Sequence, residues 1–193
     1  MPTPDVRSPH RVFCFSAVPK SVTLTCYYKI TTSIEKGGDI LILHSEHAFS
    51  KAEKIIKRYG TRDAILITEE LGIIVFPRKF KNQKAAYTVI EHNRYIFIKE
   101  DLDPVTYNLI LLHEIGHDVL HRKEAIARGG FHEKNPFDLS TCRMEHEANL
   151  FAAHISLPDD ELDYYVGQGY SFEQIARIMQ SDPYLVKLKL KHR

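Results

Sequence analysis

The chain has 193 residues, of which 44% are hydrophobic and 26% charged. These values exclude a disordered or fibrous protein and suit one globular domain. Twenty-six basic and 25 acidic residues give a formal charge of +1, so no global field argues for nucleic acid or an anionic membrane as the main partner. No apolar run reaches the roughly 18 residues that span a bilayer. Three cysteines without a CxxC pair indicate a reducing compartment, and we expect a cytoplasmic protein.

Residues 1–44 differ from the rest, and we interpret them as an N-terminal extension to one domain over residues 45–193. Residues 1–20 carry four prolines and no periodicity. Residues Glu35–Asp39 can be encoded by a nucleotide sequence that contains a bacterial ribosome-binding site. Leu41, shortly after it, can be encoded by an alternative start codon. A mis-called gene start is therefore one interpretation of this region, and a genuine extension with a Gly-Gly turn is the other.

From Ser45 onward the apolar periodicity predicts two helices that lead into a small antiparallel sheet. Ser45 is a good N-cap for the first helix, which Gly60 ends, and Thr61 can cap the second. The dipeptide His92-Asn93 has the character of a hairpin turn. We expect helices at 45–60 and 61–71 and strands at 73–76, 87–91 and 94–99.

The second half of the chain is predicted to be helical. Asp103-Pro104 combines an N-cap with proline at the first helical position, so a helix starts there and runs through His121. A polar stretch separates it from a helix that Ser140 or Thr141 caps and that ends near Ile155. Shorter helices are expected at 159–166, 172–180 and 183–191, and the segment 170–193 has the pattern of a helix-turn-helix hairpin.

The candidate chemistry begins with His113-Glu114-Ile115-Gly116-His117, an H-E-x-x-H motif inside a predicted helix. Spacing four places both imidazoles on one face, where they can hold one Zn²⁺. Glu114 projects to the side, where it can act as general base towards a water and return the proton to the leaving amine. A helix with two solvated histidines is the competing interpretation. The apolar flanks favour burial, and buried histidines need a partner.

A catalytic zinc needs a third protein ligand, and we expect it from the next helix. Glu145 shares a face with Ala148 and Asn149, and small alanines let two helices approach closely, so Glu145 is the favoured ligand. Glu147 is the rival, although it points more to the side and can pair with a surface cation. Asn149 can orient a ligand imidazole. Three histidines along one straight helix cannot share a metal, so His121 is expected beside the site rather than in it.

These motifs together resemble the ImmA/IrrE family of metallopeptidases. The resemblance rests on His113-Glu-Ile-Gly-His117 followed by Glu145-His-Glu-Ala-Asn-Leu-Phe-Ala-Ala-His-Ile-Ser-Leu-Pro158, and it extends over about residues 45–191. It implies a zincin-like α+β fold and a Zn²⁺-dependent endopeptidase. It further implies a helix-turn-helix repressor as substrate, whose cleavage relieves repression of transcription. The pattern Glu145-x-x-Ala148-Asn149 is similar to the ligand helix of other zinc peptidases, which supports Glu145.

The sequence also permits alternative functions, and it differs from the family pattern in places. A non-enzymatic zinc-stabilised module that sequesters a repressor or binds DNA is one rival function, and a toxin of a two-gene stress module is another. We expect the segment 170–193 to be a structural cap rather than a direct DNA reader. If Tyr95–Lys99 is a free edge strand, an extended substrate can add to it. Tyr87 is expected to be a packed sheet tyrosine rather than an oxyanion donor, and Ser156 departs from the family's usual aliphatic residue.

Overall fold

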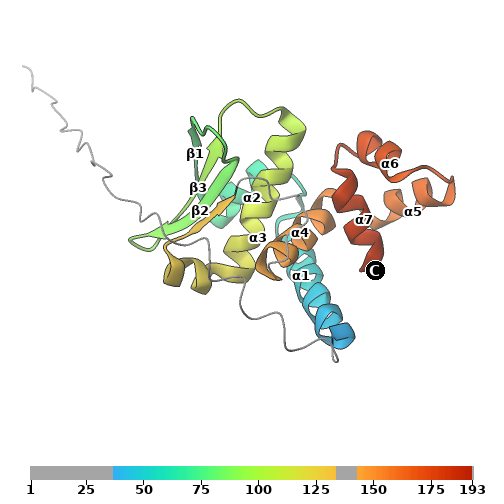
Figure 1. Cartoon of the computed structure of the whole chain (residues 1–193), viewed down its shortest axis with the longest axis horizontal. Helices are drawn as coiled ribbons and strands as arrows, with labels where there is room; N and C mark the ends of the chain where they lie inside the picture. The colour runs from blue at the N-terminus through green and yellow to red at the C-terminus, as the bar shows by residue number, and fades with distance from the viewer. Residues whose placement is uncertain (1–36, 134–142, 193) are drawn as a thin grey trace, which may run out of the picture. The chain divides into compact units, whose positions relative to one another are not determined.

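The computed structural model describes residues 37–133 and 143–192, except for the side chains of 37–44, 132 and 133 (Figure 1). This part of the chain is α+β, as predicted. None of its helices combines the length and apolarity that a bilayer crossing requires. The elements are α1 (Gly37–Tyr59), α2 (Ala64–Leu71), β1 (Ile74–Arg78), β2 (Ala85–Ile90), β3 (Asn93–Lys99), α3 (Pro104–Arg128), β4 (Phe131–Glu133), α4 (Arg143–Ser156), α5 (Asp159–Gly167), α6 (Phe172–Ile178) and α7 (Pro183–Lys191).

The four strands form a mixed sheet in the order β1-β3-β2-β4, so the prediction of an antiparallel sheet was wrong for β1. Strands β2 and β3 form the expected hairpin, but its turn lies at Glu91 and His92, one residue earlier than the predicted His92-Asn93, with φ angles of 49° and 66°. Two positive φ values give the backbone twist that tight hairpins favour. Strand β1 lies on the other side of β3 and runs parallel to it, with Phe76 opposite Phe97.

A further strand lies where a polar loop was expected. Helix α3 continues past His121 to Arg128, and the chain then reverses through Gly129 and Gly130, at φ angles of 76° and 116°. A Cβ atom on Gly130 would stand 2.8 Å from the carbonyl oxygen of Tyr87. Only glycine has no side chain to clash at this positive φ angle and this short distance from the Tyr87 backbone. The reversal of the chain at Gly130 allows β4 to pair with β2.

The candidate substrate edge is corrected by the same topology. Strand β3 contains Tyr95–Lys99 and pairs with β1 on one side and β2 on the other. Its backbone groups are therefore used within the sheet, and the prediction of a free edge there was wrong. The outer strands of the described sheet are β1 and β4.

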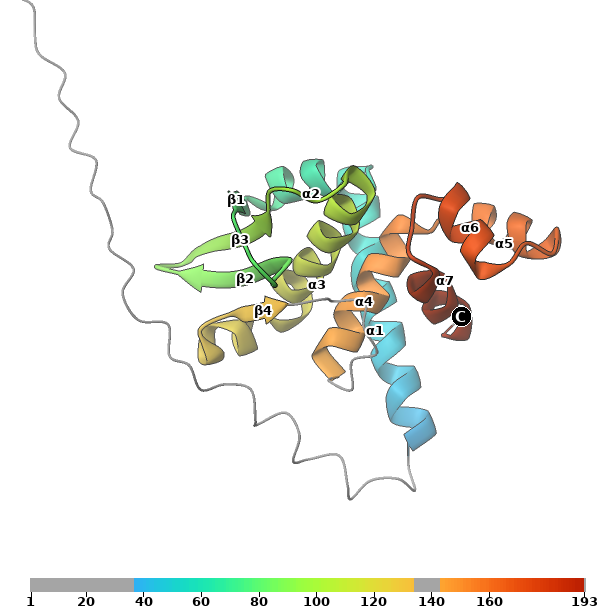
Figure 2. The same cartoon turned by 45° about the horizontal axis from the view of Figure 1, so that its top comes forward.

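Helix α3 lies between the sheet and the pair α1 and α4, as Figure 2 shows. One apolar cluster joins sheet residues such as Ile96 and Ile98 to Ile110 and Ile115 of α3. A second cluster joins α4 to the helices α5, α6 and α7 through residues such as Leu150, Leu162 and Leu185. The central helix is therefore covered on both sides, and ten consecutive residues of it are buried, from Leu109 to Asp118.

The helix starts were predicted with mixed success. Asp103 caps α3 with Pro104 behind it, and Ser171 and Gln174 form a complete capping box at α6. Helix α1, however, begins at Gly37, and Ser45 is a buried residue inside it. Asp63 rather than Thr61 caps α2, because its carboxylate accepts from two backbone N–H groups, those of residues 65 and 66. The expected caps Ser140 and Thr141 and the whole of residues 1–36 lie outside the described part.

Candidate metal centre

The two histidines of the H-E-x-x-H motif face each other on the buried part of α3. His113 and His117 are both fully buried, and their Nε2 atoms are 3.0 Å apart. The rings meet edge to face, with centroids 4.7 Å apart. Two ring nitrogens at this separation, one helical turn apart, can share one cation.

Glu145 of α4 brings a carboxylate to the same point. Its Oε2 atom lies 3.2 Å from Nε2 of His113 and 3.4 Å from Nε2 of His117. Among the described residues, these three form the one group of His, Cys, Asp or Glu whose ligand atoms converge closely enough to hold a metal ion. The two histidines and the glutamate come from helices separated by the whole of β4 and the segment before α4.

The donor set fits a tetrahedral cation. Two ligand atoms at about 2.0–2.1 Å from a tetrahedral zinc lie about 3.3 Å from each other, and the three separations here span 3.0–3.4 Å. Burial lowers the pKa of His117, so its ring is neutral and offers a lone pair. Burial alone would raise the pKa of Glu145, but its close contacts with the imidazoles of His113 and His117 hold that pKa far below its usual range. A charged carboxylate and a neutral imidazole are the forms that bind metals.

Glu114 is the second acidic group of the site and has a different character. It is fully buried, and neither of its carboxylate oxygens has a hydrogen-bond partner among the described residues. Burial, and then the negative charge of Glu145, raise the pKa of Glu114 well above its usual range. A bound dication would lower that pKa again. A carboxyl group in this setting can take a proton from a water and hand it on.

Two neighbours fix the ring orientations. Nδ1 of His113 and Oδ1 of Asn149 are 2.8 Å apart, so an Nδ1–H donated to the amide leaves the Nε2 lone pair for a metal. The ring of His117 stacks on Phe131 of β4, with centroids 4.4 Å apart and planes within 19°. The expectation that Asn149 orients a ligand imidazole agrees with this geometry.

Glu147 and His121 lie beside the three donors rather than among them. Glu147 is buried, with its Oε1 atom 3.3 Å from Nε of Arg143 and its Oε2 atom 3.4 Å from Nε2 of His121. It pairs with an arginine, as expected, but it is not on the surface. Burial lowers the pKa of His121 to about 3, so this ring is neutral.

A buried carboxylate on the other side of α3 was missed from the sequence. Asp118 accepts hydrogen bonds from the Tyr87 hydroxyl at 2.7 Å, from NH1 of Arg94 at 3.0 Å and from Nε and NH2 of Arg122 at 3.0 and 2.7 Å. Tyr87 is fully buried and committed to this network, which agrees with the expected packed tyrosine. The one sequence signal was Arg122, four residues after Asp118 on the same helix.

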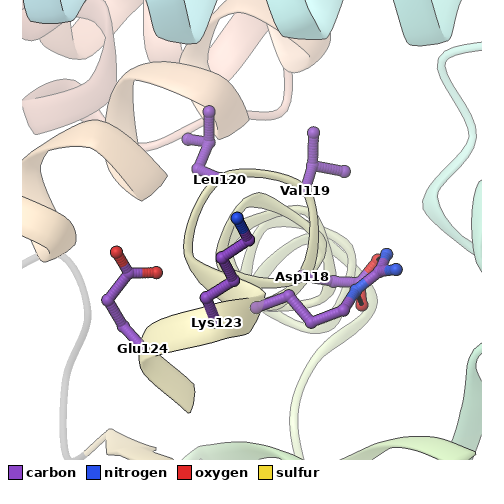
Figure 3. Close-up of a pocket in the computed structure, with 6 residues that line it drawn as sticks. Asp118, Val119, Leu120, Lys123 and Glu124 are labelled. Atoms are coloured by element: carbon purple, nitrogen blue, oxygen red, sulfur yellow. Dashed lines mark hydrogen bonds and ion pairs between the residues drawn. The ribbon is translucent and has the colours of Figure 1, made fainter. Parts of the chain in front are cut away.

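Two surface hollows of the described part are lined by residues other than the metal donors. One, of about 450 Å³, surrounds the end of α3 from Asp118 to Glu124 (Figure 3). In this view down the helix, Val119 and Leu120 project to one side, whereas Asp118 projects to another. A second hollow, of about 490 Å³, lies between α2, α3, α4 and α6. The chemistry is therefore assigned from the converging side chains and not from a cavity.

Comparison with known proteins decides the family. The profile of the IrrE N-terminal-like domain, Peptidase M78, matches residues 68–183 and so covers more than half of the chain. The chain belongs to this family. The match includes α3 and α4, which carry His113, His117 and Glu145, and it bears out the resemblance to ImmA/IrrE proteins.

Two relatives of this IrrE-like domain extend the comparison. Metallopeptidase ImmA of Bacillus subtilis strain 168 is 27% identical over 165 residues, which cover 78% of this chain and 88% of that protein. Uncharacterized immunity region protein 2 of Bacillus phage phi105 is 27% identical over 125 residues, which cover 64% of this chain and 77% of that protein. Membership of Peptidase M78 and the metal-binding cluster make the chain a metallopeptidase, a hydrolase that uses a metal cofactor.

Proposed function

We propose that this protein is a zinc-dependent endopeptidase with a zincin-like fold, and that it hydrolyses a peptide bond in a helix-turn-helix repressor and so relieves repression. The observation that carries the proposal is the convergence of His113, His117 and Glu145 within 3.0–3.4 Å, next to the unpartnered buried Glu114. In this assignment, the first three residues bind Zn²⁺ and Glu114 is the catalytic residue.

The protein's own groups divide the reaction between them. Bound zinc would polarise the scissile carbonyl and lower the pKa of the attacking water. Glu114 would take a proton from that water and return it to the amine of the leaving peptide. Its burial supports this role, because a carboxylate without competing hydrogen bonds is free to exchange a proton. Asn149 would hold His113 in the tautomer that binds zinc.

Strand β4 is the edge that we propose for the substrate, in place of β3. It is an outer strand of the described sheet, and Phe131, at its start, stacks on His117. An extended peptide that pairs with the outer side of β4 would therefore run beside the metal ligands. Main-chain hydrogen bonds of this kind bind a peptide with little dependence on its side chains.

The substrate class is proposed from the relatives. One is named a metallopeptidase and the other an immunity region protein of a phage, and immunity of a phage is a matter of repression. A repressor works on the chromosome, so we propose a cytoplasmic enzyme that acts in transcription regulation. The role of α7 as a cap is supported by its packing, because Leu185, Val186 and Leu188 are buried against neighbouring helices.

The first prediction concerns Glu114→Gln. We expect the variant to bind zinc at the same stoichiometry as the unaltered protein but to cleave about 10²–10⁴-fold more slowly, because only the proton transfer is removed. The measurement is metal content together with cleavage, by mass spectrometry, of a candidate helix-turn-helix repressor mixed with the protein. Glu124→Gln, a partly buried glutamate further along α3, is the matched control and should keep full activity.

Two outcomes would contradict the proposal. Full activity in Glu114→Gln would remove the assigned base. Stable binding of the repressor by the zinc-loaded protein, without any cleavage, would favour the sequestering module instead. Cleavage of the repressor at one site, which is lost when either zinc or Glu114 is removed, would support the endopeptidase. Neither the sequestering module nor a protein in which zinc has only a structural role would produce such a cut.

A further inference from the structure

His121 lies at a break in the central helix. Its backbone angles, φ −129° and ψ 22°, are the non-helical ones inside α3, which continues beyond it to Arg128. Its side chain is buried, with 3% of the residue exposed, and its ring centroid is 5.7 Å from that of His117. A kink at this position changes the direction of the imidazole, which in a straight helix would simply follow His113 and His117 along one face.

The imidazole of His121 contacts helix α4 close to Glu145. Its Nε2 atom lies 3.4 Å from Oε2 of Glu147, which also contacts Arg143. Glu145, the third donor of the proposed metal site, lies two residues before Glu147 on the same helix. His121 itself is not part of the converging group.

The position of Glu145 makes these contacts important. It lies in the first turn of a helix whose described part starts at Arg143. First-turn residues lack the backbone hydrogen bonds that hold a helix interior, so their direction depends on side-chain partners. A small tilt of this turn would move Oε2 of Glu145 away from the imidazoles, which it approaches to 3.2 and 3.4 Å.

We propose that His121 is a positioning residue that fixes the first turn of α4 and thereby seats Glu145 as the third metal ligand. The inference rests on the proposed function, because it assumes that the three donors bind zinc. It goes beyond that function because it assigns a role to a further residue, which lies outside the group of metal donors. Residues of this kind commonly change metal affinity about 10–100-fold.

The test compares zinc dissociation constants, measured on the full chain by competition with a chromogenic chelator. We expect His121→Ala to weaken zinc binding about tenfold or more. His121→Asn, which retains an N–H donor, should recover part of this loss. His154→Ala is the control, because this part-buried histidine lies at the C-terminal end of α4 and contacts Glu53 of α1. The zinc dissociation constant of this variant should lie within about twofold of that of the unaltered protein. Circular dichroism of the metal-free variants checks that each is folded.

A double-mutant cycle with Glu145→Gln decides the mechanism. If His121 acts through Glu145, His121→Ala should cost almost nothing further once Glu145 is replaced, since coupled residues are non-additive. Equal losses in both backgrounds would overturn the proposal, as would unchanged zinc binding by His121→Ala. A loss as large as that of His113→Ala would also overturn it, by making His121 a ligand. Failure of the unaltered protein to bind zinc would instead refute the proposed function.

Discussion

Neighbouring residues of α3 face different partners, and this divides the roles of the helix. His117 turns towards Glu145 of α4, whereas Asp118 turns towards the sheet, where it meets Tyr87 and Arg94. Successive helical residues project about 100° apart, so one dipeptide can serve both the metal site and the contact between helix and sheet. The buried carboxylate of Asp118 therefore ties α3, which carries two of the proposed metal ligands, to the sheet.

Replacement of Asp118 tests this role. Asp118→Asn keeps the size of the side chain but leaves the partly buried Arg94 without its charged partner. Loss of one member of a buried pair commonly costs about 3–5 kcal/mol, and we expect the lower end because Arg122 is partly exposed. Urea unfolding of the metal-free protein measures the change. Asp101→Asn, which removes an exposed pair with Lys99, should change stability by less than about 1 kcal/mol. Equal losses of stability in Asp118→Asn and Asp101→Asn would contradict the proposed role of Asp118 in holding α3 to the sheet.

At the scale of the elements, the metal site depends on how closely α3 and α4 approach. Gly116 lies between the motif histidines, and a Cβ atom there would stand 3.1 Å from Cα of Ala148 and 3.3 Å from Phe151. Both helices use small residues at the crossing, which lets Glu145 of one reach His113 and His117 of the other. The glycine inside H-E-x-x-H is thus a packing requirement of this chain as well as part of its motif.

Gly116→Val should separate the two helices. The added side chain meets the backbone of α4, so we expect a loss of about 1–3 kcal/mol in stability from overpacking, together with weaker zinc binding as Glu145 recedes. Thermal unfolding and chelator competition measure the two effects. Gly167→Val is the matched control: this glycine is also helical, and a Cβ atom there meets nothing within 4 Å. If the control loses as much stability as Gly116→Val, helix propensity rather than close packing is responsible.

At the scale of the whole molecule, the proposed ligands join segments that are far apart in the chain. His113 belongs to the helix that packs on the sheet, whereas Glu145 belongs to the helix that contacts α1 and α7. A cation bound by both would add a link between α3 and α4 to the apolar contacts that these helices already share in the cluster around the sheet. Metal binding and folding should therefore be coupled.

Zinc should raise the stability of the protein by an amount that grows with the logarithm of the ratio of the free zinc concentration to its dissociation constant. A ligand that binds only the folded chain adds about 2.7 kcal/mol at a free concentration 100 times its dissociation constant. For a protein of this size, that corresponds to a rise of about 5–10 °C in Tm. Differential scanning fluorimetry with zinc and with a chelator measures it. His113→Ala should show no such rise, and an equal rise in that variant would place the stabilising zinc at another site.

Local patterns predicted those parts of this chain that depend on nearby residues. The start of α3 follows from Asp103 and Pro104, and the hairpin follows from the polar turn between two apolar segments. The predictions that failed concern distant partners. The parallel pairing of β1 with β3 and the pairing of β4 with β2 join segments whose own sequences do not indicate their neighbours. The central place of β3 belongs to the same class of error.

The amino-acid sequence alone determined the α+β class, the helical H-E-x-x-H segment and a short list of residues that can bind a metal. These follow from the helical period, which sets the distance between residues four apart before any packing occurs. The tertiary structure decided which acid faces the imidazoles and which is held by Arg143 and His121. It also placed Asp118 in its network with Tyr87. Such contacts form between side chains that only the packing of distant elements brings together.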